Sequence, residues 1–290
     1  MLKRTRSLLF IGVVALLTLA VAESLRAEGD VKRGEYLVKA SGCVDCHTEE
    51  KKEAIPFAGG RALQTPFGTF YGPNITPDPK KGIGRWSEAD FIRAMRFGVR
   101  PDGAALFPAF PYPSFTKITD ADLDHIWAYL RTLTPDSRPS QAHNLRFPYR
   151  WRFMVRGWKW LFFRPGEFRA DPTQPSKVNR GAYIVQALSH CGECHTPRNF
   201  LGAPRWERYL AGGKGPDGKN VPNLTPTGLK KWSDSDLQYY LTTGIEPDGD
   251  IAGGKMAEVV QSMTGGLTPE DLAAVIAYLR TLPPVENEAR

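Results

Sequence analysis

Hydrophobic residues recur at helical spacing in two long segments that each begin with a threonine. The first segment starts at Thr119 and the second at Thr268. The apolar positions are Leu123, Ile126, Trp127 and Leu130 in the first, and Leu272, Val275, Ile276 and Leu279 in the second. This spacing puts the apolar side chains on one face of an α-helix. No stretch alternates apolar and polar residues convincingly, so the pattern predicts an all-α fold.

Two further pairs of helices are predicted. One pair runs through Tyr36 and Tyr183, and the other starts at Ser87 and Ser233. A serine at that position can accept hydrogen bonds from backbone N–H groups in the first turn of the helix. Long segments rich in glycine and proline join the helices, since the chain holds 28 glycines and 24 prolines.

These segments belong to a duplicated unit. The matching stretches are 33–38 with 180–185, 73–77 with 222–226, 86–87 with 232–233, 98–103 with 244–249, and 128–133 with 277–282. A repeat this regular indicates two copies of one fold. We expect three helices in each copy, the first copy in residues 28–137 and the second in 176–284. A linker, 138–175, joins them, and residues 285–290 form a short tail.

All four cysteines lie in two copies of one pentapeptide. The first is Cys43-Val44-Asp45-Cys46-His47, and the second is Cys191-Gly192-Glu193-Cys194-His195. The pattern C-x-x-C-H is the attachment signature of c-type haem, in which both thiols bind the porphyrin covalently and the histidine binds the iron. Two motifs predict two covalent haems, with His47 and His195 as axial ligands. A porphyrin at the centre of each copy would also explain the long loops.

Other uses of four cysteines fit less well. A zinc site needs four ligands close together, whereas each pair here sits in its own repeat with a histidine behind it. A thioredoxin-like C-x-x-C is expected beside a βαβ pattern, and none surrounds either motif. A disulfide across a two-residue gap would constrain the unfolded chain very little.

The N-terminus predicts export. Lys3, Arg4 and Arg6 precede an apolar run of 15 residues, 8–22, and small residues follow. This is the form of a signal peptide, cleaved after Ala22 or Ala27, and the run is short for a spanning helix. The periplasm is the expected compartment. The protein is expected there either free or attached to the inner membrane, through a partner or through residues 1–27 retained as an anchor. Loss of the three cations lowers the formal net charge from +7 to +4, so the charge does not indicate nucleic-acid binding.

The chain resembles the cytochrome c subunits of membrane-associated alcohol, gluconate and related dehydrogenases. The shared stretches are the Arg-Gly-x-Tyr lead-in, C-x-x-C-H-Thr, Pro-Asn-x-Thr-Pro, Gly-x-x-Pro-Asp-Gly and Ala-Tyr-Leu-Arg-Thr-Leu, over residues 31–284. The resemblance implies two tandem class I cytochrome c domains and assigns Met256 as the distal ligand of the second haem, with Met263 as the fallback. Many relatives carry three haem domains, whereas this chain has two motifs.

The first haem lacks the corresponding methionine. At the family position stands Phe110, which cannot bind iron. Either the sixth position is open, or another side chain fills it. Met95 is the candidate ligand, although the same residue could simply pack in the core. His125, His143 and Lys117 are weaker candidates.

Aromatic and basic residues alternate through the linker. The stretch 147–168 holds three tryptophans among several arginines. Such a segment either clasps the two domains together, or docks on a partner or at the surface of a membrane.

Three classes of function remain open, of which the third is a structural or sensory haem protein. The first is a carrier with no catalytic residue, which takes electrons from a dehydrogenase and passes them to a quinone, another cytochrome or an oxidase. The second is an enzyme that uses the first haem iron on peroxide or a sulfur oxyanion, with Arg93, Arg96 and Arg100 lining the substrate site.

Overall fold

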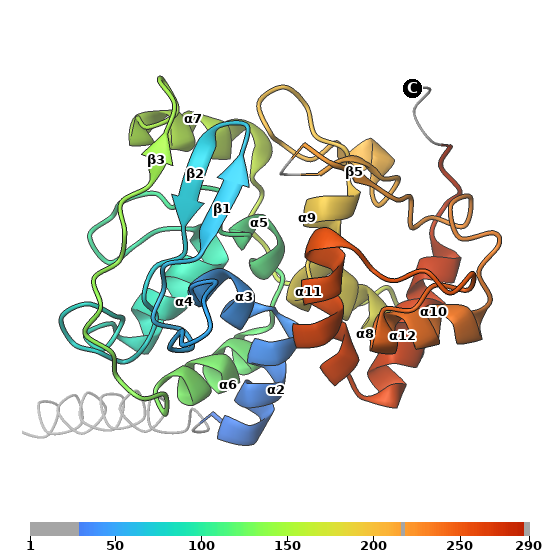
Figure 1. Cartoon of the computed structure of the whole chain (residues 1–290), viewed down its shortest axis with the longest axis horizontal. Helices are drawn as coiled ribbons and strands as arrows, with labels where there is room; N and C mark the ends of the chain where they lie inside the picture. Colours follow the sequence, from blue (N-terminus) through green and yellow to red (C-terminus); the bar gives the residue numbers. More distant parts are fainter. Residues whose placement is uncertain (1–28, 216–217, 287–290) are drawn as a thin grey trace, which may run out of the picture.

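The computed structural model describes residues 29–215 and 218–286 (Figure 1). The predicted signal peptide lies outside these residues. In the first copy the helices are α2 (Val31–Ala40), α3 (Cys43–His47), α4 (Glu88–Phe97), α5 (Tyr112–Phe115) and α6 (Asp120–Leu130). In the second they are α8 (Ser176–Tyr183), continued by the π-helix Ile184–Leu188, then α9 (Gly192–His195), α10 (Asp234–Thr243), α11 (Gly254–Ser262) and α12 (Pro269–Thr281). Helix α7 (Arg152–Phe162) lies in the linker between them. The fold is mostly helical, as predicted.

The predicted helix starts are confirmed. Ser87 and Ser233 each accept a hydrogen bond from the backbone N–H three residues later, and the carboxylates of Asp90 and Asp236 accept one from the backbone N–H of the serine. The hydroxyls of Thr119 and Thr268 cap α6 and α12 in the same way. Helix one of each copy ends three residues before its first motif cysteine, as expected.

Short strands were not predicted. The first copy contributes β1 (Ala62–Thr65) and β2 (Gly68–Tyr71) to an antiparallel sheet whose third strand, β3 (Asn144–Leu145), belongs to the linker. The second copy contains β4 (Gly213–Lys214) paired with β5 (Asn220–Val221). None exceeds four residues, and hairpins this short leave no alternating pattern in the sequence. Three-residue 3-10 helices, Trp206–Arg208 and Thr264–Gly266, complete the second copy.

The glycine of each Arg-Gly-x-Tyr stretch allows helices one and three to touch. A Cβ atom at Gly34 would lie 1.9 Å from the carbonyl oxygen of His125 on α6, and one at Gly181 would lie 1.9 Å from that of Ala274 on α12. Only glycine permits this approach of two backbones. The pairs α2–α6 and α8–α12 therefore form the closest helix contacts of the two domains.

The two domains share one hydrophobic core. Buried residues from both copies, among them Leu37, Ile126, Ile184 and Val275, belong to a single cluster. Figure 1 shows the first copy in blue and green beside the second in yellow and red, with α2 and α11 at the boundary. Covering apolar surface of both copies gives the interface a large favourable free energy.

Polar contacts across the interface follow the repeat. The Tyr36 hydroxyl donates to Asp271 Oδ2 at 2.5 Å, and the equivalent Tyr183 hydroxyl donates to the equivalent Asp122 Oδ2 at 2.7 Å. Arg180 holds Asp271 with two hydrogen bonds of 2.7 and 2.6 Å, whereas the equivalent Arg33 lies 3.5 Å from Asp122. The interface is therefore nearly two-fold symmetric, and the arginine and tyrosine of the repeated stretch both serve it.

Two candidate haem-attachment sites

Each C-x-x-C-H motif forms a short helix. Within α3, Cys43 and Cys46 stand about one turn apart; Cys191 and Cys194 stand likewise at the start of α9. Within the described residues, none of the four cysteines forms a disulfide. Burial raises the pKa of Cys43 to about 12, of Cys46 to about 11 and of Cys191 to about 12. Such thiols do not behave as low-pKa redox-active cysteines.

The two motif histidines are oriented identically. The Nδ1 atom of His47 lies 2.7 Å from the carbonyl oxygen of Pro73, and that of His195 lies 2.9 Å from that of Pro222. A carbonyl can only accept, so Nδ1 carries the proton and Nε2 keeps its lone pair for a metal. Burial lowers the pKa of both histidines, which favours the neutral form that binds iron.

Both carbonyls belong to the repeated Pro-Asn-x-Thr-Pro loop, and the asparagine fixes that loop. The Asn74 side-chain amide donates to the carbonyl oxygens of Asp136 at 2.7 Å and Arg138 at 3.0 Å, while its Oδ1 accepts from the Thr76 N–H at 2.9 Å. In the second copy, Asn223 donates to the carbonyl of Val285 at 2.7 Å. The chain after helix three is thereby tied to the loop that orients the histidine.

Asn74→Ala is expected to lower the free energy of unfolding by about 2–3 kcal/mol, because it removes the hydrogen bonds of a buried side-chain amide and leaves two half-buried carbonyl groups without their donor. Thermal unfolding followed by circular dichroism measures the loss. Asn144→Ala, which removes an exposed asparagine side chain from β3, is the control and is expected to change stability by less than ~0.5 kcal/mol. An Asn74→Ala protein as stable as the control would show that the hydrogen bonds of Asn74 contribute little to stability.

The residues present fit covalent haem. Each copy combines two thiols, one imidazole with a free Nε2, and a surrounding apolar core. The Tyr209 hydroxyl is buried and finds no hydrogen-bond acceptor among residues 29–215 and 218–286, and its pKa is raised by burial and, to a smaller extent, by nearby groups that include Cys191. A polar group of a cofactor in the second copy would satisfy this hydroxyl.

Met256 lies partly exposed in the first turn of α11. Met263, the fallback, is buried with its sulfur against Gly42, immediately before Cys43 of the first motif. The assignment of Met256 stays a prediction.

In the first copy, Met95 is buried on α4 in the same core as Phe91, whose ring stacks on Trp127 at 5.3 Å between centroids. Phe110 is partly buried and packs on Phe115, with ring centroids 5.5 Å apart. The sixth ligand of this site stays a prediction.

The weaker candidates all make other contacts. His125 Nδ1 accepts from the Asp30 N–H at 2.8 Å, and His143 Nδ1 accepts from the Tyr71 N–H at 3.1 Å. Lys117 donates to Gln186 Oε1 at 3.0 Å across the domain interface, and burial lowers its pKa.

The arginines of the enzyme hypothesis are engaged by carboxylates. Arg96 is buried and binds Asp120 at 2.5 Å, Arg93 binds Asp90 at 2.5 Å, and Arg100 lies 3.0 Å from Asp102. These ion pairs neutralise the charge that an anionic substrate would need.

The two motifs lie close together across the interface. The Cys194 thiol is near enough to raise the pKa of Cys46 slightly, after the larger effects of burial and Asp45. The third residue of each motif binds the other domain: Asp45 accepts from Ser262 at 2.5 Å, and Glu193 accepts from Ser114 at 2.7 Å. The acidic third position recurs in both copies, a signal that could have indicated this role.

Helix α11 is held on the first domain at two points. Besides the bond from Ser262, Glu258 accepts two hydrogen bonds from Arg61, at 2.9 and 2.8 Å. Arg61 is itself buried, and no sequence pattern singled it out. The helix that carries Met256 of the second copy is therefore positioned partly by the first.

Among the described residues, no helix is both long enough and apolar enough to cross a membrane.

Comparison with known proteins agrees with these observations. The family model for cytochrome c matches residues 31–134 and again 178–283. A diheme cytochrome c-type protein of Cereibacter sphaeroides is 43% identical over 262 residues, which cover 89% of this chain and 88% of that protein. The fructose dehydrogenase cytochrome subunit of Gluconobacter japonicus is 40% identical over 87% of this chain and 52% of its own length. The cytochrome c subunit of the quinone-type alcohol dehydrogenase of Gluconobacter oxydans is 37% identical over 89% of this chain.

The chain thus spans nearly all of the diheme relative, but about half the length of the two dehydrogenase subunits, 52% and 56%. On the matched residues and these identities, the chain belongs to the cytochrome c family and consists of two cytochrome c domains in tandem.

Proposed function

We propose that the chain is a periplasmic di-haem cytochrome c, which accepts electrons from a partner dehydrogenase and passes them to the respiratory chain. The observation that carries the proposal is the pair of C-x-x-C-H helices, each with its histidine Nδ1 bound to a proline carbonyl. The relatives named as dehydrogenase cytochrome subunits support the donor. The acceptor is a quinone, another cytochrome or a terminal oxidase.

In each domain the cysteines would hold haem c covalently, and the histidine would bind the iron. Haem c, when bound, supplies a reversible one-electron change at iron. We assign His47 and His195 as proximal ligands, Met256 as the distal ligand of the second haem, and Met95 as that of the first. The domain boundaries proposed are 28–137 and 176–284, after a signal peptide in residues 1–27.

The protein's own contribution is to hold the two haems in fixed positions. The symmetric pairs Tyr36–Asp271 and Tyr183–Asp122 fix the domains against each other. The contacts of Asp45 and Glu193 hold each motif against the opposite domain. Fixed, neighbouring cofactors exchange electrons without moving, so a rigid interface suits a carrier.

The test is the haem content and ligation of the purified protein. We expect two covalent c-type haems per chain, uptake of two electrons in a reductive titration, and no binding of carbon monoxide. A single haem would contradict the di-haem proposal. A haem that binds carbon monoxide and turns over peroxide would instead support the enzyme hypothesis, in which the iron of the first haem is open because Phe110 replaces methionine.

A further inference from the structure

Helix α7 has two apolar faces, and only one is covered. Val155 is buried, and Lys159 donates to the carbonyl oxygens of Phe97 and Gly98 in the first domain. The uncovered side chains are Phe153, Met154, Trp160 and Leu161, which lie on one face with Gly157 at their centre. Phe153 is 67% exposed and Trp160 78%. A helix that only clasped two domains would not need this second face.

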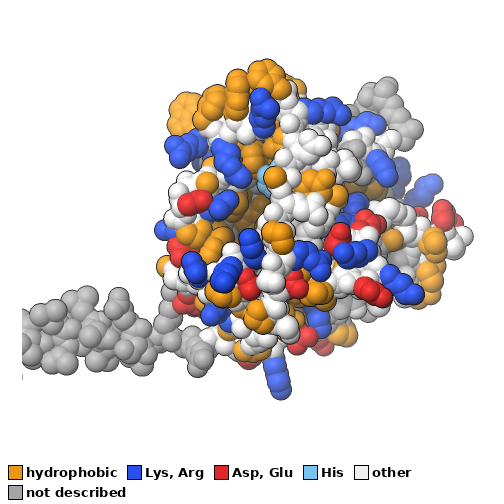
Figure 2. All heavy atoms as spheres, turned by 60° about the vertical axis from the view of Figure 1, so that its left-hand side comes forward, with side chains coloured by type: hydrophobic (Ala, Val, Ile, Leu, Met, Phe, Trp, Pro, Cys, Tyr) orange, Lys and Arg blue, Asp and Glu red, His pale blue; other side chains and the backbone are white. Residues whose placement is uncertain are grey.

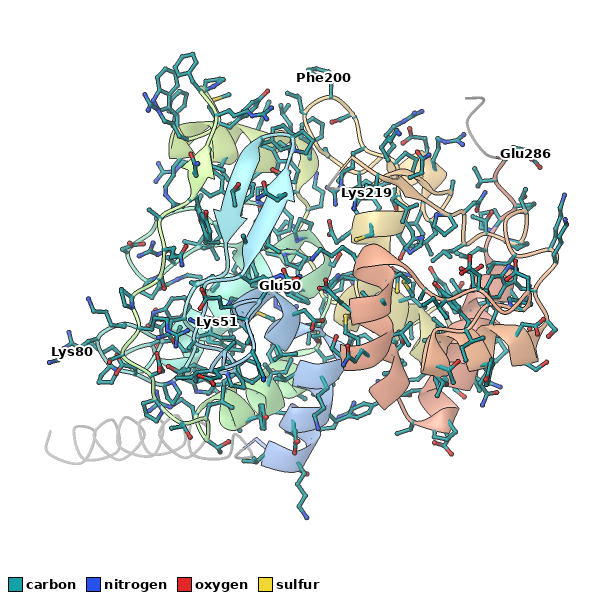
Figure 3. All side chains as sticks on the ribbon, viewed as in Figure 1. Glu50, Lys51, Lys80, Phe200, Lys219 and Glu286 are labelled. Carbon is teal, nitrogen blue, oxygen red and sulfur yellow. The ribbon has the colours of Figure 1, made fainter. Side chains whose placement is uncertain are left out.

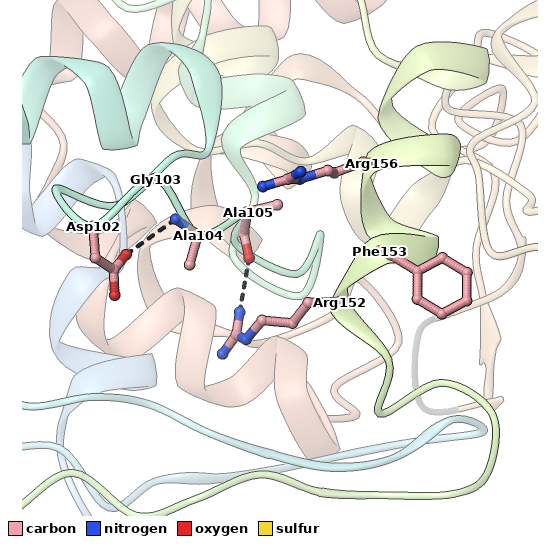
Figure 4. A pocket seen from close by; sticks show the side chains of 7 residues that line it. All are labelled: Asp102, Gly103, Ala104, Ala105, Arg152, Phe153 and Arg156. Carbon is pink, nitrogen blue, oxygen red and sulfur yellow. Dashed lines mark hydrogen bonds between the residues drawn. The ribbon is translucent and has the colours of Figure 1, made fainter.

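Figure 4 shows a surface cavity of about 430 Å³, which Arg152, Phe153 and Arg156 of α7 line together with residues 102–105. The Arg152 guanidinium donates to the carbonyl oxygen of Ala105 at 2.7 Å, whereas the Phe153 ring lies on the opposite side of the helix from that guanidinium. Trp158 Nε1 donates to the Leu201 carbonyl of the second domain at 3.0 Å. Both domains therefore hold α7 in a fixed orientation, with its second face outward.

Neighbouring aromatic residues extend that face. Phe147 and Trp151 pack edge to face with centroids 4.9 Å apart, and Trp151 stacks on Phe153 at 5.7 Å. From the second domain comes Phe200, which is 88% exposed and stands at the same end of the molecule in Figure 3. Figure 2 shows hydrophobic side chains gathered at this end, with lysines and arginines next to them. We call this surface the aromatic face: Phe147, Trp151, Phe153, Met154, Trp160, Leu161 and Phe200.

The segment that carries all of the aromatic face except Phe200 has charges of one sign. No aspartate or glutamate occurs between residues 137 and 166, whereas Arg146, Arg150, Arg156 and Arg164 all lie there and are exposed. Exposed apolar patches of this kind mark interaction sites. The occupant must offer an apolar layer for the aromatic rings and negative charge for the arginines.

We propose that the aromatic face lies on an anionic lipid bilayer, with α7 parallel to the membrane surface. An amphipathic helix with tryptophan and phenylalanine on one side and cations beside them is the form that binds at the lipid interface. Tryptophan favours that level of the bilayer, and each arginine near an anionic surface adds attraction. The face would hold the protein beside the membrane without a spanning helix.

The experiment measures binding of the purified haem-loaded protein to vesicles by flotation. Vesicles of phosphatidylethanolamine with phosphatidylglycerol are compared with vesicles of phosphatidylcholine alone. The variant combines Phe153→Ser with Trp160→Ser, and every protein compared has the same N-terminus, established by mass spectrometry. We expect binding to the anionic vesicles to fall at least tenfold in the variant, since it no longer has the two large apolar side chains that would insert into the lipid.

The matched control combines Tyr239→Ser with Ile251→Ser, two exposed apolar residues of the second domain outside the aromatic face. It is expected to bind as the wild type does. Equal binding of all three proteins, or no binding of the wild type to anionic vesicles, would overturn the proposal. If the wild type does not bind anionic vesicles, and a dehydrogenase co-purifies with the wild type but not with the variant, the aromatic face binds a protein partner instead. Haem content is measured on the same samples, so failure of the carrier proposal is detected separately.

Discussion

Met256→Leu is expected to lower the reduction potential of one haem by on the order of 0.1 V and to leave the other nearly unchanged. The thioether sulfur stabilises ferrous iron, and axial ligands set haem potentials over a range of ~0.8 V. Leucine is close to methionine in volume, so the first turn of α11 is expected to keep its structure. A potentiometric titration followed at the visible haem bands measures both potentials, and a far-red scan reports the methionine–iron charge-transfer band.

Met263→Leu is the matched control, since Met263 is buried at the end of the same helix against Gly42. It is expected to cost less than ~1.5 kcal/mol of stability and to leave both potentials in place. If Met263→Leu removes the methionine signature and Met256→Leu does not, the assignment is reversed. Met95→Leu answers the same question for the first haem: loss of the remaining methionine signature assigns the ligand, and its persistence excludes Met95.

The parts of the fold that depend on neighbouring residues could be predicted. The caps at Ser87, Thr119, Ser233 and Thr268 are local hydrogen bonds, and all four appear as expected. The strands β1 and β2 could not be, because they depend on a turn at Gly68, where a Cβ would lie 2.4 Å from the carbonyl oxygen of Asn144 far along the chain. The C-x-x-C-H motif is contiguous and can be recognised in the sequence, whereas the tertiary structure decides which side chain becomes the sixth ligand of a haem iron.

The polar contacts between the two domains could not be predicted from the sequence for a related reason. Asp122 and Asp271 stand in the first turns of α6 and α12, where acidic residues favour the helix N-terminus in any protein. Only the packed structure brings Tyr183 and Tyr36 to them. The sequence left two roles open for the linker, to clasp the domains or to dock on a partner or a membrane. The structure of α7 is compatible with both, because one face contacts the domains and the other remains exposed.

Asp271→Asn is expected to lower the free energy of unfolding by about 2–4 kcal/mol near neutral pH. Asp271 is buried and accepts hydrogen bonds from Arg180 and from Tyr36 of the other domain. Removing one partner of a buried ion pair leaves the other charge uncompensated, which costs about 3–5 kcal/mol when both are fully buried. The partial exposure of Arg180 reduces that figure. Denaturant unfolding followed by circular dichroism measures the difference.

The loss depends on pH with a definite sign. Burial raises the pKa of Asp271, but hydrogen bonds from Arg180 and Tyr36 outweigh it and hold that pKa below the usual value of 3.8. A carboxyl whose pKa is lower in the folded state stabilises the fold above its unfolded pKa, and that contribution disappears as the pH falls through the folded pKa. The gap between wild type and Asp271→Asn should therefore be constant above about pH 5 and shrink below about pH 4.

The repeat supplies the control. Asp122→Asn removes the symmetric carboxylate, but its arginine lies 3.5 Å away instead of forming two bonds of 2.7 and 2.6 Å, so the loss should be smaller. Glu270→Gln, at the exposed neighbouring position of α12, should be nearly neutral. Equal stability of Asp271→Asn and Glu270→Gln would mean that the hydrogen bonds of Asp271 add nothing to stability. The apolar core and the other polar contacts between the domains would then be sufficient to hold them together.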